Sequence, residues 1–269
     1  MGSNQRIVSG RAALAATVLG SGEPVVFLHA RIADSRMWSA QLDGVGAHNK
    51  AIAYDRRGFG DTRAEKEDFS AVADLMAVID AMADGKPAIL VACSEGGRIA
   101  IDAALRHPSI VRALVLISPS VAGAPEPIYP PEIKSLMAQM REAEESGNLD
   151  QVIALRARLF LDGPSASEGR VTGQARRLFH DMNAIALRSQ PTGPNIDAAP
   201  AFHRLGEISV PSLVICGDLD LPNIQERSRH IASTMLNGSH HELAVAAHLP
   251  SLERPADIMD LLTEFIKRC

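Results

Sequence analysis

Ser94 stands where a serine can act as a nucleophile. It is the middle residue of A-C-S-E-G at residues 92–96, after the apolar, β-prone run 88–93 and before a helix-compatible stretch. A strand that enters a helix through one tight turn holds the middle residue on a strained corner, with its side chain clear of the backbone. The residues two before and two after must be small because strand and helix come close there, and Ala92 and Gly96 meet that need.

A serine hydroxyl is a poor nucleophile unless a base takes its proton, and a third group must orient that base. His248 follows the last predicted strand of the chain. Two acids, Asp218 and Asp220, follow the apolar run 212–216. The order serine, aspartate, histidine at the carboxyl ends of later strands predicts acyl transfer through a covalent intermediate.

Apolar runs separated by helical patterns must position these residues. The runs predicted as strands are 25–28, 51–54, 88–93, 113–118 and 212–216. Continuous apolar strands alternating with helices indicate a parallel sheet that is covered on both faces. A starting hairpin at 6–19, a helix at 69–82, a last strand at 242–246 and a closing helix at 256–265 complete this pattern.

The alternation stops at residue 122. From 123 to 206 a proline-rich entry leads to three helical patterns, at 133–140, 152–160 and 171–187. We therefore predict that residues 1–122 and 207–269 form an α/β core, with a helical cap at 123–206. An insertion at the carboxyl edge of a sheet lies over the site found there.

Composition and charge exclude several classes of protein. The formal net charge is −5 and the charges are dispersed, which argues against a nucleic-acid surface or an acidic membrane as partner. No apolar run approaches the roughly 20 residues of a membrane span. Three scattered cysteines are too few for a disulfide framework or a zinc site. We expect a cytoplasmic protein that needs no metal or other cofactor; its oligomeric state stays open.

From about residue 20 to 267 the sequence resembles the α/β-hydrolase fold family. The matching stretches are L-H-A at 28–30, Trp38, D-R-R-G-F-G at 55–60, the turn at Ser94, G-D-L-D at 217–220 and H-L-P at 248–250. Residues 29–38 and C-S-E-G-G at 93–97 are also similar to small capped hydrolases that resemble 3-oxoadipate enol-lactonase. The resemblance implies an α/β-hydrolase fold, a mostly parallel central sheet with helices on both faces and a helical cap insertion.

The resemblance also implies roles for particular residues. Ser94, Asp220 and His248 match the triad of the family, whose acid lies three residues after the glycine of the G-D-L-D stretch. Asp218 is then a turn or surface residue.

Two backbone N–H groups should hold the oxyanion. Glu95 supplies one at the start of a helix, where the helix dipole assists, and Arg31 supplies the other by its position two after His29. Ala30 and Glu95 depart from the family, which usually has Gly and Met there. The Arg31 guanidinium either pairs with Asp34 or binds a substrate carboxylate.

Other polar residues near the site have structural interpretations. We expect His29 to brace its loop, and Asp55 and Arg56 to fix the loop after their strand by pairing there. Cys93 lies one position too early for a nucleophile and should be a small buried residue. The histidines at 240–241 precede the predicted last strand and should face solvent.

The function favoured by these residues is metal-independent hydrolysis of a small ester or lactone, a small-molecule substrate, by a serine hydrolase. A second enzyme class keeps the triad and changes the bond or the acceptor: acyl transfer, perhydrolysis or carbon–carbon cleavage in a β-diketone. A third alternative is a ligand receptor that retains a slow triad. Substrate identity is not encoded in the motifs, because the pocket walls come from the cap.

Overall fold

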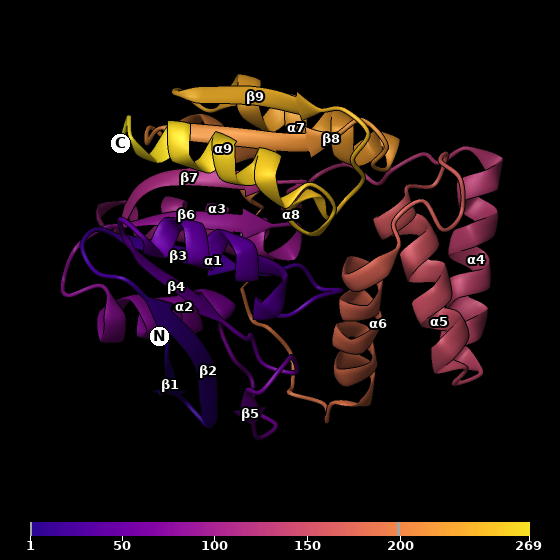
Figure 1. The fold of residues 1–269 in the computed structure, drawn as a ribbon, viewed down its shortest axis with the longest axis horizontal. Helices are drawn as coiled ribbons and strands as arrows, with labels where there is room; N and C mark the ends of the chain where they lie inside the picture. Colours follow the sequence, from indigo (N-terminus) through magenta and orange to yellow (C-terminus); the bar gives the residue numbers. More distant parts are fainter. Residues whose placement is uncertain (1, 198–199) are drawn as a thin grey trace.

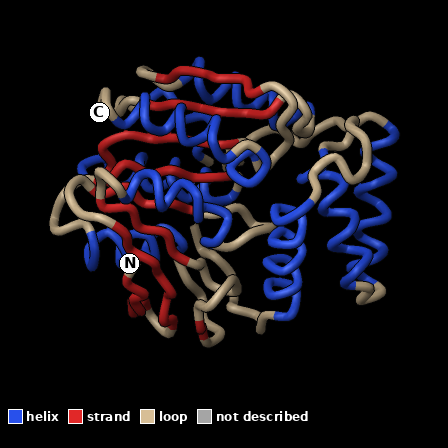
Figure 2. The backbone as a smooth tube through the Cα atoms, viewed as in Figure 1, coloured by secondary structure: helices blue, strands red, loops and turns tan. Residues whose placement is uncertain are grey.

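The computed structural model describes residues 2–197 and 200–269, and within these residues nine strands form one sheet (Figures 1 and 2). The strands are β1 (Ser3–Ser9), β2 (Ala12–Leu19), β3 (Pro24–Leu28), β4 (Lys50–Tyr54), β5 (Arg63–Ala64), β6 (Ala88–Cys93), β7 (Val111–Ile117), β8 (Ser212–Gly217) and β9 (Gly238–Leu243). Their order is β1-β2-β4-β3-β6-β7-β8-β9, with β5 beside β2. Only the pairings made by β2 are antiparallel, so the predicted mostly parallel sheet is confirmed.

Helices cover both faces of the sheet. They are α1 (Ser39–Gly46), α2 (Ala71–Met82), α3 (Glu95–Arg106), α7 (Pro222–Thr234), α8 (Pro250–Glu253) and α9 (Pro255–Ile266). Alternate residues of each strand enter different cores. In β3, Val25 and Phe27 pack on the face of α1 and α9, whereas Val26 and Leu28 pack on the face of α2, α3 and α7. Burial on both faces explains why these strands read as unbroken apolar runs.

The chain between β7 and β8 is helical. It contains α4 (Pro131–Glu145), α5 (Leu149–Arg156), a π-helical turn (Ala157–Asp162) and α6 (Gly173–Arg188). The pattern at 152–160 was expected to form one helix, and it is divided between α5 and the π-helical turn. Figure 1 shows α4, α5 and α6 beyond the end of the sheet toward which β8 points.

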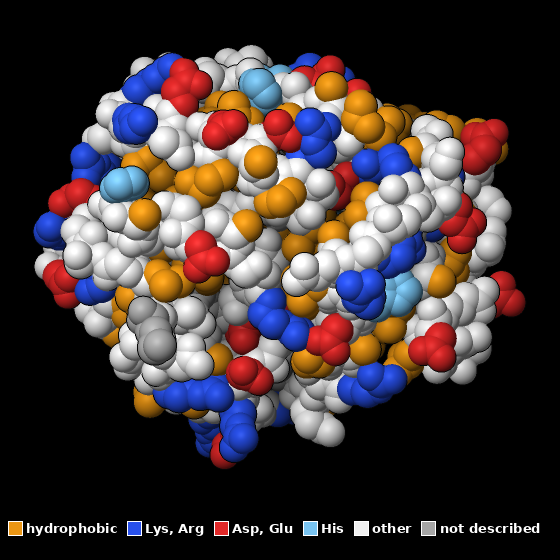
Figure 3. Space-filling model, in the orientation of Figure 1, with side chains coloured by type: hydrophobic (Ala, Val, Ile, Leu, Met, Phe, Trp, Pro, Cys, Tyr) orange, Lys and Arg blue, Asp and Glu red, His pale blue; other side chains and the backbone are white. Residues whose placement is uncertain are grey.

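Short 3₁₀ helices complete the fold at Ser35–Trp38, Pro108–Ile110 and Ala201–Glu207. Through residues 2–197 and 200–269, we find no helix with the length and apolar character to span a bilayer. Basic and acidic side chains are interspersed over the face drawn in Figure 3, in keeping with the dispersed charges of the sequence.

The last strand differs from its predicted position. β9 spans Gly238–Leu243 instead of 242–246, so His240 and His241 lie inside the strand and are half-buried. Among the described strands, β9 lies at the edge of the sheet and pairs with β8 alone. An edge tolerates polar side chains that stay partly in water. A polar edge strand carries no apolar run, which is why the sequence pattern placed it too late.

Gly96, in the first turn of α3, packs directly against the end of β3. A Cβ at this position would lie 2.5 Å from the carbonyl oxygen of Leu28 and 2.9 Å from that of His29. These are main-chain atoms at the carboxyl end of β3, a strand in the middle of the sheet order, so they cannot move without displacing the strand. The small residue predicted two after the serine is therefore required by contact with the next strand.

We expect Gly96→Ala to destabilise the protein by about 1–3 kcal/mol, the cost of inserting a methyl group into a filled site. Urea unfolding followed by circular dichroism measures the change. Gly206→Ala is the matched control, because a Cβ there would meet nothing closer than 3.8 Å. Equal stability of the two variants would contradict the steric requirement at Gly96.

Candidate active site

The predicted site residues gather at the carboxyl ends of the parallel strands. Ser94 directly follows β6, Asp220 follows β8, His248 follows β9 and Arg31 follows β3. Parallel strands that neighbour one another end at the same edge of a sheet, so residues far apart in the sequence meet there (Figure 1).

Ser94 occupies a strained turn. Its φ of 53° lies in the left-handed region, which costs a non-glycine residue of the order of 1–2 kcal/mol. The turn is fixed on both sides: the Ser94 N–H donates to the carbonyl of Ile117, and the Ser120 N–H and hydroxyl both donate to the Ser94 carbonyl. β7 and the loop after it therefore hold the serine in this conformation, half-buried at the start of α3.

Asp220 and His248 form a buried pair. The imidazole Nδ1 lies 2.9 Å and 3.0 Å from the two carboxylate oxygens, and the residues are 2% and 3% exposed. A carboxylate can only accept, so the Nδ1–H donates to Asp220, and in the neutral ring Nε2 is then unprotonated and can take up a proton. Asp218 is exposed and accepts a long bond from the Ala246 N–H at 3.4 Å. Of the two candidate acids, Asp220 is the one that contacts the histidine.

The main chain of His248 is also held. Its N–H donates to the carbonyl of Phe160 at 3.1 Å, and its carbonyl accepts from the Cys93 thiol at 3.7 Å. The Phe160 and His248 rings pack with their centroids 5.3 Å apart. The histidine thus lies against the residue before Ser94, although among the described residues no hydrogen bond joins the serine hydroxyl to the imidazole. Catalytic hydrogen bonds are often long before substrate binds.

Glu95 makes an ion pair that the sequence did not predict. Its carboxylate lies 3.1 Å from the Arg56 guanidinium, which also stacks over the Phe59 ring. Burial raises the pKa of Glu95, but the charge and hydrogen bond of Arg56, with help from Arg31, outweigh it and hold the pKa below its usual value. The residue after Ser94 therefore carries a negative charge that Arg56 balances.

The expected pairing of Arg56 with Asp55 is wrong, and so is one of the two alternatives for Arg31, the pairing with Asp34. Asp34 accepts instead from the Arg36 guanidinium at 2.7 Å, and Arg31 is exposed. Asp55 accepts from the backbone N–H groups of Ser35 and Asp61, at 2.8 Å each, rather than from Arg56.

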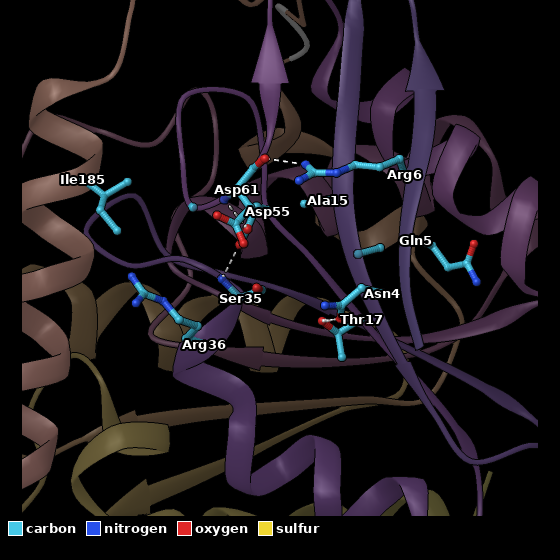
Figure 4. A pocket seen from close by; sticks show the side chains of 12 residues that line it. Asn4, Gln5, Arg6, Ala15, Thr17, Ser35, Arg36, Asp55, Asp61 and Ile185 are labelled. Carbon is cyan, nitrogen blue, oxygen red and sulfur yellow. Dashed lines mark hydrogen bonds between the residues drawn. The ribbon is translucent and has the colours of Figure 1, made fainter. Parts of the chain in front are cut away.

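A small cavity of about 190 Å³ lies beside Asp55 and Ser35 (Figure 4). It is lined on its other side by residues of β1 and β2, and contains none of the five predicted site residues. A second cavity, of about 390 Å³, lies closer to Ser94. Arg31, Arg56 and Glu95 line it from the core, and residues between Ala186 and Asn195 line it from the end of α6 and the segment that follows. This second cavity opens next to the predicted oxyanion donors.

His29 braces the loop that carries Arg31, as expected. The backbone N–H of Arg56 donates to Nε2 at 2.9 Å, so the ring proton is on Nδ1, which donates to the Ala30 carbonyl at 2.8 Å. Burial, with the Arg56 charge, lowers the pKa of His29 well below its usual value. The ring is a neutral link between the loops after β3 and β4.

Two of the three cysteines lie inside the core beside the predicted site. Cys93 and Cys216 are buried, and burial, with the nearby Asp220 charge, raises the pKa of both thiols. Within residues 2–197 and 200–269, no three histidine, cysteine or acidic side chains are grouped closely enough to hold a metal ion.

Sequence reasoning missed three contacts of the His248 loop. Glu253 accepts from the N–H groups of Ala247 and Leu249, Arg170 pairs with Glu253, and Phe160 packs on the imidazole. The sequence offered one sign of the role of Glu253, which is an acid only five residues after His248. Phe160 and Arg170 come from the segment between β7 and β8, where no motif marks them.

Comparison with known proteins extends these observations. A family model described as the alpha/beta hydrolase family matches residues 25–261. A pimeloyl-(acyl-carrier protein) methyl ester esterase of Yersinia enterocolitica is 25% identical over 264 residues, which cover 93% of this chain and 96% of the esterase.

Solved structures share the fold over its whole length. An esterase from Rhodococcus sp. matches with a TM-score of 0.78 and 21% identity, covering 99% of this chain and 98% of that one. The enol-lactonase from Burkholderia xenovorans matches with a TM-score of 0.74 and 20% identity, covering 98% and 100%.

We expect the neutral state of His29 to make stability depend on pH. Below about pH 6.5, His29 binds a proton in the unfolded state but stays neutral in the folded state. The free energy of unfolding therefore falls as the pH drops, by up to about 1.4 kcal/mol per pH unit. Urea unfolding between pH 5.5 and 7.5 measures this slope. His29→Gln should be less stable and show a smaller slope, whereas His48→Gln, which removes an exposed histidine, should keep the wild-type slope. The same slope in the wild type and His29→Gln would refute this origin.

Proposed function

The chain belongs to the α/β-hydrolase family, and on that premise we propose that it is a serine hydrolase that cleaves a small ester or lactone through an acyl-enzyme. The observation that carries the proposal is the buried Asp220–His248 pair, whose geometry leaves one imidazole nitrogen free to act as a base. The strained turn at Ser94 supplies the nucleophile at the same edge of the sheet.

In the proposed reaction, His248 takes the proton of the Ser94 hydroxyl as the serine oxygen attacks the substrate carbonyl. The backbone N–H groups of Arg31 and Glu95 stabilise the oxyanion that forms. The ester bond then breaks, and His248 gives its proton to the leaving alcohol oxygen. Water, deprotonated by His248, attacks the acyl-enzyme; the bond to the Ser94 oxygen breaks, His248 returns the proton to that oxygen and the acid is released.

Residues 123–206 act as the cap of this site in our proposal. Contacts with the core support the assignment: the Asn183 amide donates to the Ile32 carbonyl at 2.8 Å, and Phe160 touches His248. The cap then provides the walls that select the substrate. The relatives named above are two esterases and an enol-lactonase, which favours a carboxylic ester or a lactone as substrate.

Other uses of the same triad differ in measurable products. An acyltransferase or perhydrolase passes the acyl group to an alcohol or peroxide in preference to water, and a carbon–carbon hydrolase acts on β-diketones. A receptor gives a burst of product without turnover. A panel of lactones, short esters and β-diketones, assayed with and without acceptor alcohol, separates these outcomes.

Ser94→Ala should abolish turnover and the burst of an activated ester, with kcat lower by about 10⁴-fold or more, and leave the fold intact. His248→Ala should cause a comparable loss, and the double variant should be no worse because the two residues act together. Ser39→Ala, at an exposed serine, is the control. Wild-type turnover in Ser94→Ala would rule out the proposed mechanism.

The Arg31 guanidinium is proposed to attract a substrate carboxylate at the cavity mouth. Because Arg31 is exposed, water screens the pair, and we expect Arg31→Leu to lower kcat/KM on a carboxylate-bearing lactone by about fivefold or less. The neutral ester of the same lactone should be unaffected, since the backbone N–H remains. Arg141→Leu, at an exposed arginine of α4, should change neither rate. Equal losses on both substrates would exclude the carboxylate contact.

A further inference from the structure

The loop between β9 and α8 carries His248 and contains a strained residue. Val245 has a φ of 57°, a left-handed conformation that a β-branched residue adopts only where its surroundings hold it. Its side chain is exposed, so packing does not hold it. Hydrogen bonds between the main chain of this loop and side chains outside it must therefore hold the loop in this conformation.

Glu253 lies beneath the loop and bonds on both sides of His248. Its carboxylate accepts from the Ala247 N–H at 2.9 Å and from the Leu249 N–H at 3.3 Å. The side chain is 1% exposed, so water cannot replace these bonds. The position of the imidazole along its loop thus depends on a carboxylate that does not touch it.

Arg170 balances the buried charge of Glu253. It comes from the stretch between the π-helical turn and α6, and its guanidinium also donates to the carbonyls of Asp162 at 2.7 Å, Leu161 at 2.9 Å and Val245 at 3.1 Å. One side chain therefore bonds to the π-helical turn, to the strained residue and to Glu253.

The charged state of the Glu253 carboxylate depends on the Arg170 guanidinium. Burial raises the pKa of Glu253, and the ion pair with Arg170 and the two amide bonds act against that shift. Without Arg170, the Glu253 carboxylate would be a buried, unbalanced charge, which proteins avoid by protonation or rearrangement.

We propose that Glu253 is a positioning residue for the base His248. Through Arg170, this positioning depends on how the segment between β7 and β8 packs against the His248 loop. The inference rests on the proposed function, in which His248 is the base. Asp220 orients the ring, while Glu253 fixes the main chain that carries it. The cap segment then affects the proton transfer as well as the shape of the pocket.

Glu253→Gln tests the proposal, since the amide keeps the shape but can accept on one oxygen only. We expect kcat per active site, counted from the burst, to fall about tenfold or more, because small displacements of a catalytic group are costly. KM should change by less than about threefold. Glu242→Gln is the matched control: Glu242 also pairs with an arginine, Arg229, but on the exposed face of β9.

Variants of Arg170 provide a second test of the proposal. Arg170→Met should reproduce the loss in kcat, Arg170→Lys should restore part of it, and Arg170→Met combined with Glu253→Gln should be no worse than either single change. If Glu253→Gln fails to fold, Arg170→Lys against Arg170→Met still tests the inference.

A measurement without substrate separates this inference from the proposed function. The downfield proton resonance of the His248 ring, which reports its hydrogen bond to Asp220, should shift or broaden in Glu253→Gln and not in Glu242→Gln. A wild type without a Ser94-dependent burst contradicts the proposed function, and the resonance then tests the positioning alone. An unchanged resonance, or wild-type kcat per active site in Glu253→Gln, overturns the inference even if the variant is less stable.

Discussion

The absence of a side chain at Gly96 is the constraint on which the rest of the site depends. It brings α3 against the main chain of Leu28 and His29, and this contact sets the separation between the turn at Ser94 and the loop after β3. The two N–H groups proposed to hold the oxyanion come from these two elements. Donors preorganised in this way need no rearrangement when charge develops, which is the source of their effect.

Around that contact, buried polar side chains specify the loops. His29 joins the loops after β3 and β4, Asp55 accepts from Ser35 and Asp61, and Glu253 accepts on both sides of His248. A buried polar group that loses its partner costs more free energy than the bond itself contributes. Each of these side chains therefore excludes alternative loop arrangements, which apolar packing alone would tolerate.

The elements buried in the sheet could be predicted from the sequence because burial on both faces leaves unbroken apolar runs, as in β3 and β6. The turn at Ser94 was recognisable from its small neighbours. β9 was misplaced because an edge strand needs no such run. The Arg56–Glu95 and Arg170–Glu253 pairs join residues 39 and 83 positions apart, and several acids could have served each arginine equally well. Only the fold decides among partners of the same charge.

The bond from Phe160 to His248 connects main-chain atoms, a carbonyl and an N–H. Such a bond does not depend on which side chain stands at position 160, although that side chain lies directly against the imidazole. The histidine is thus anchored by the main chain of residue 160, whereas the side chain of residue 160 shapes the space beside the imidazole. Divergence or laboratory evolution can therefore change the side chain beside the imidazole while the main-chain bond that anchors the histidine persists.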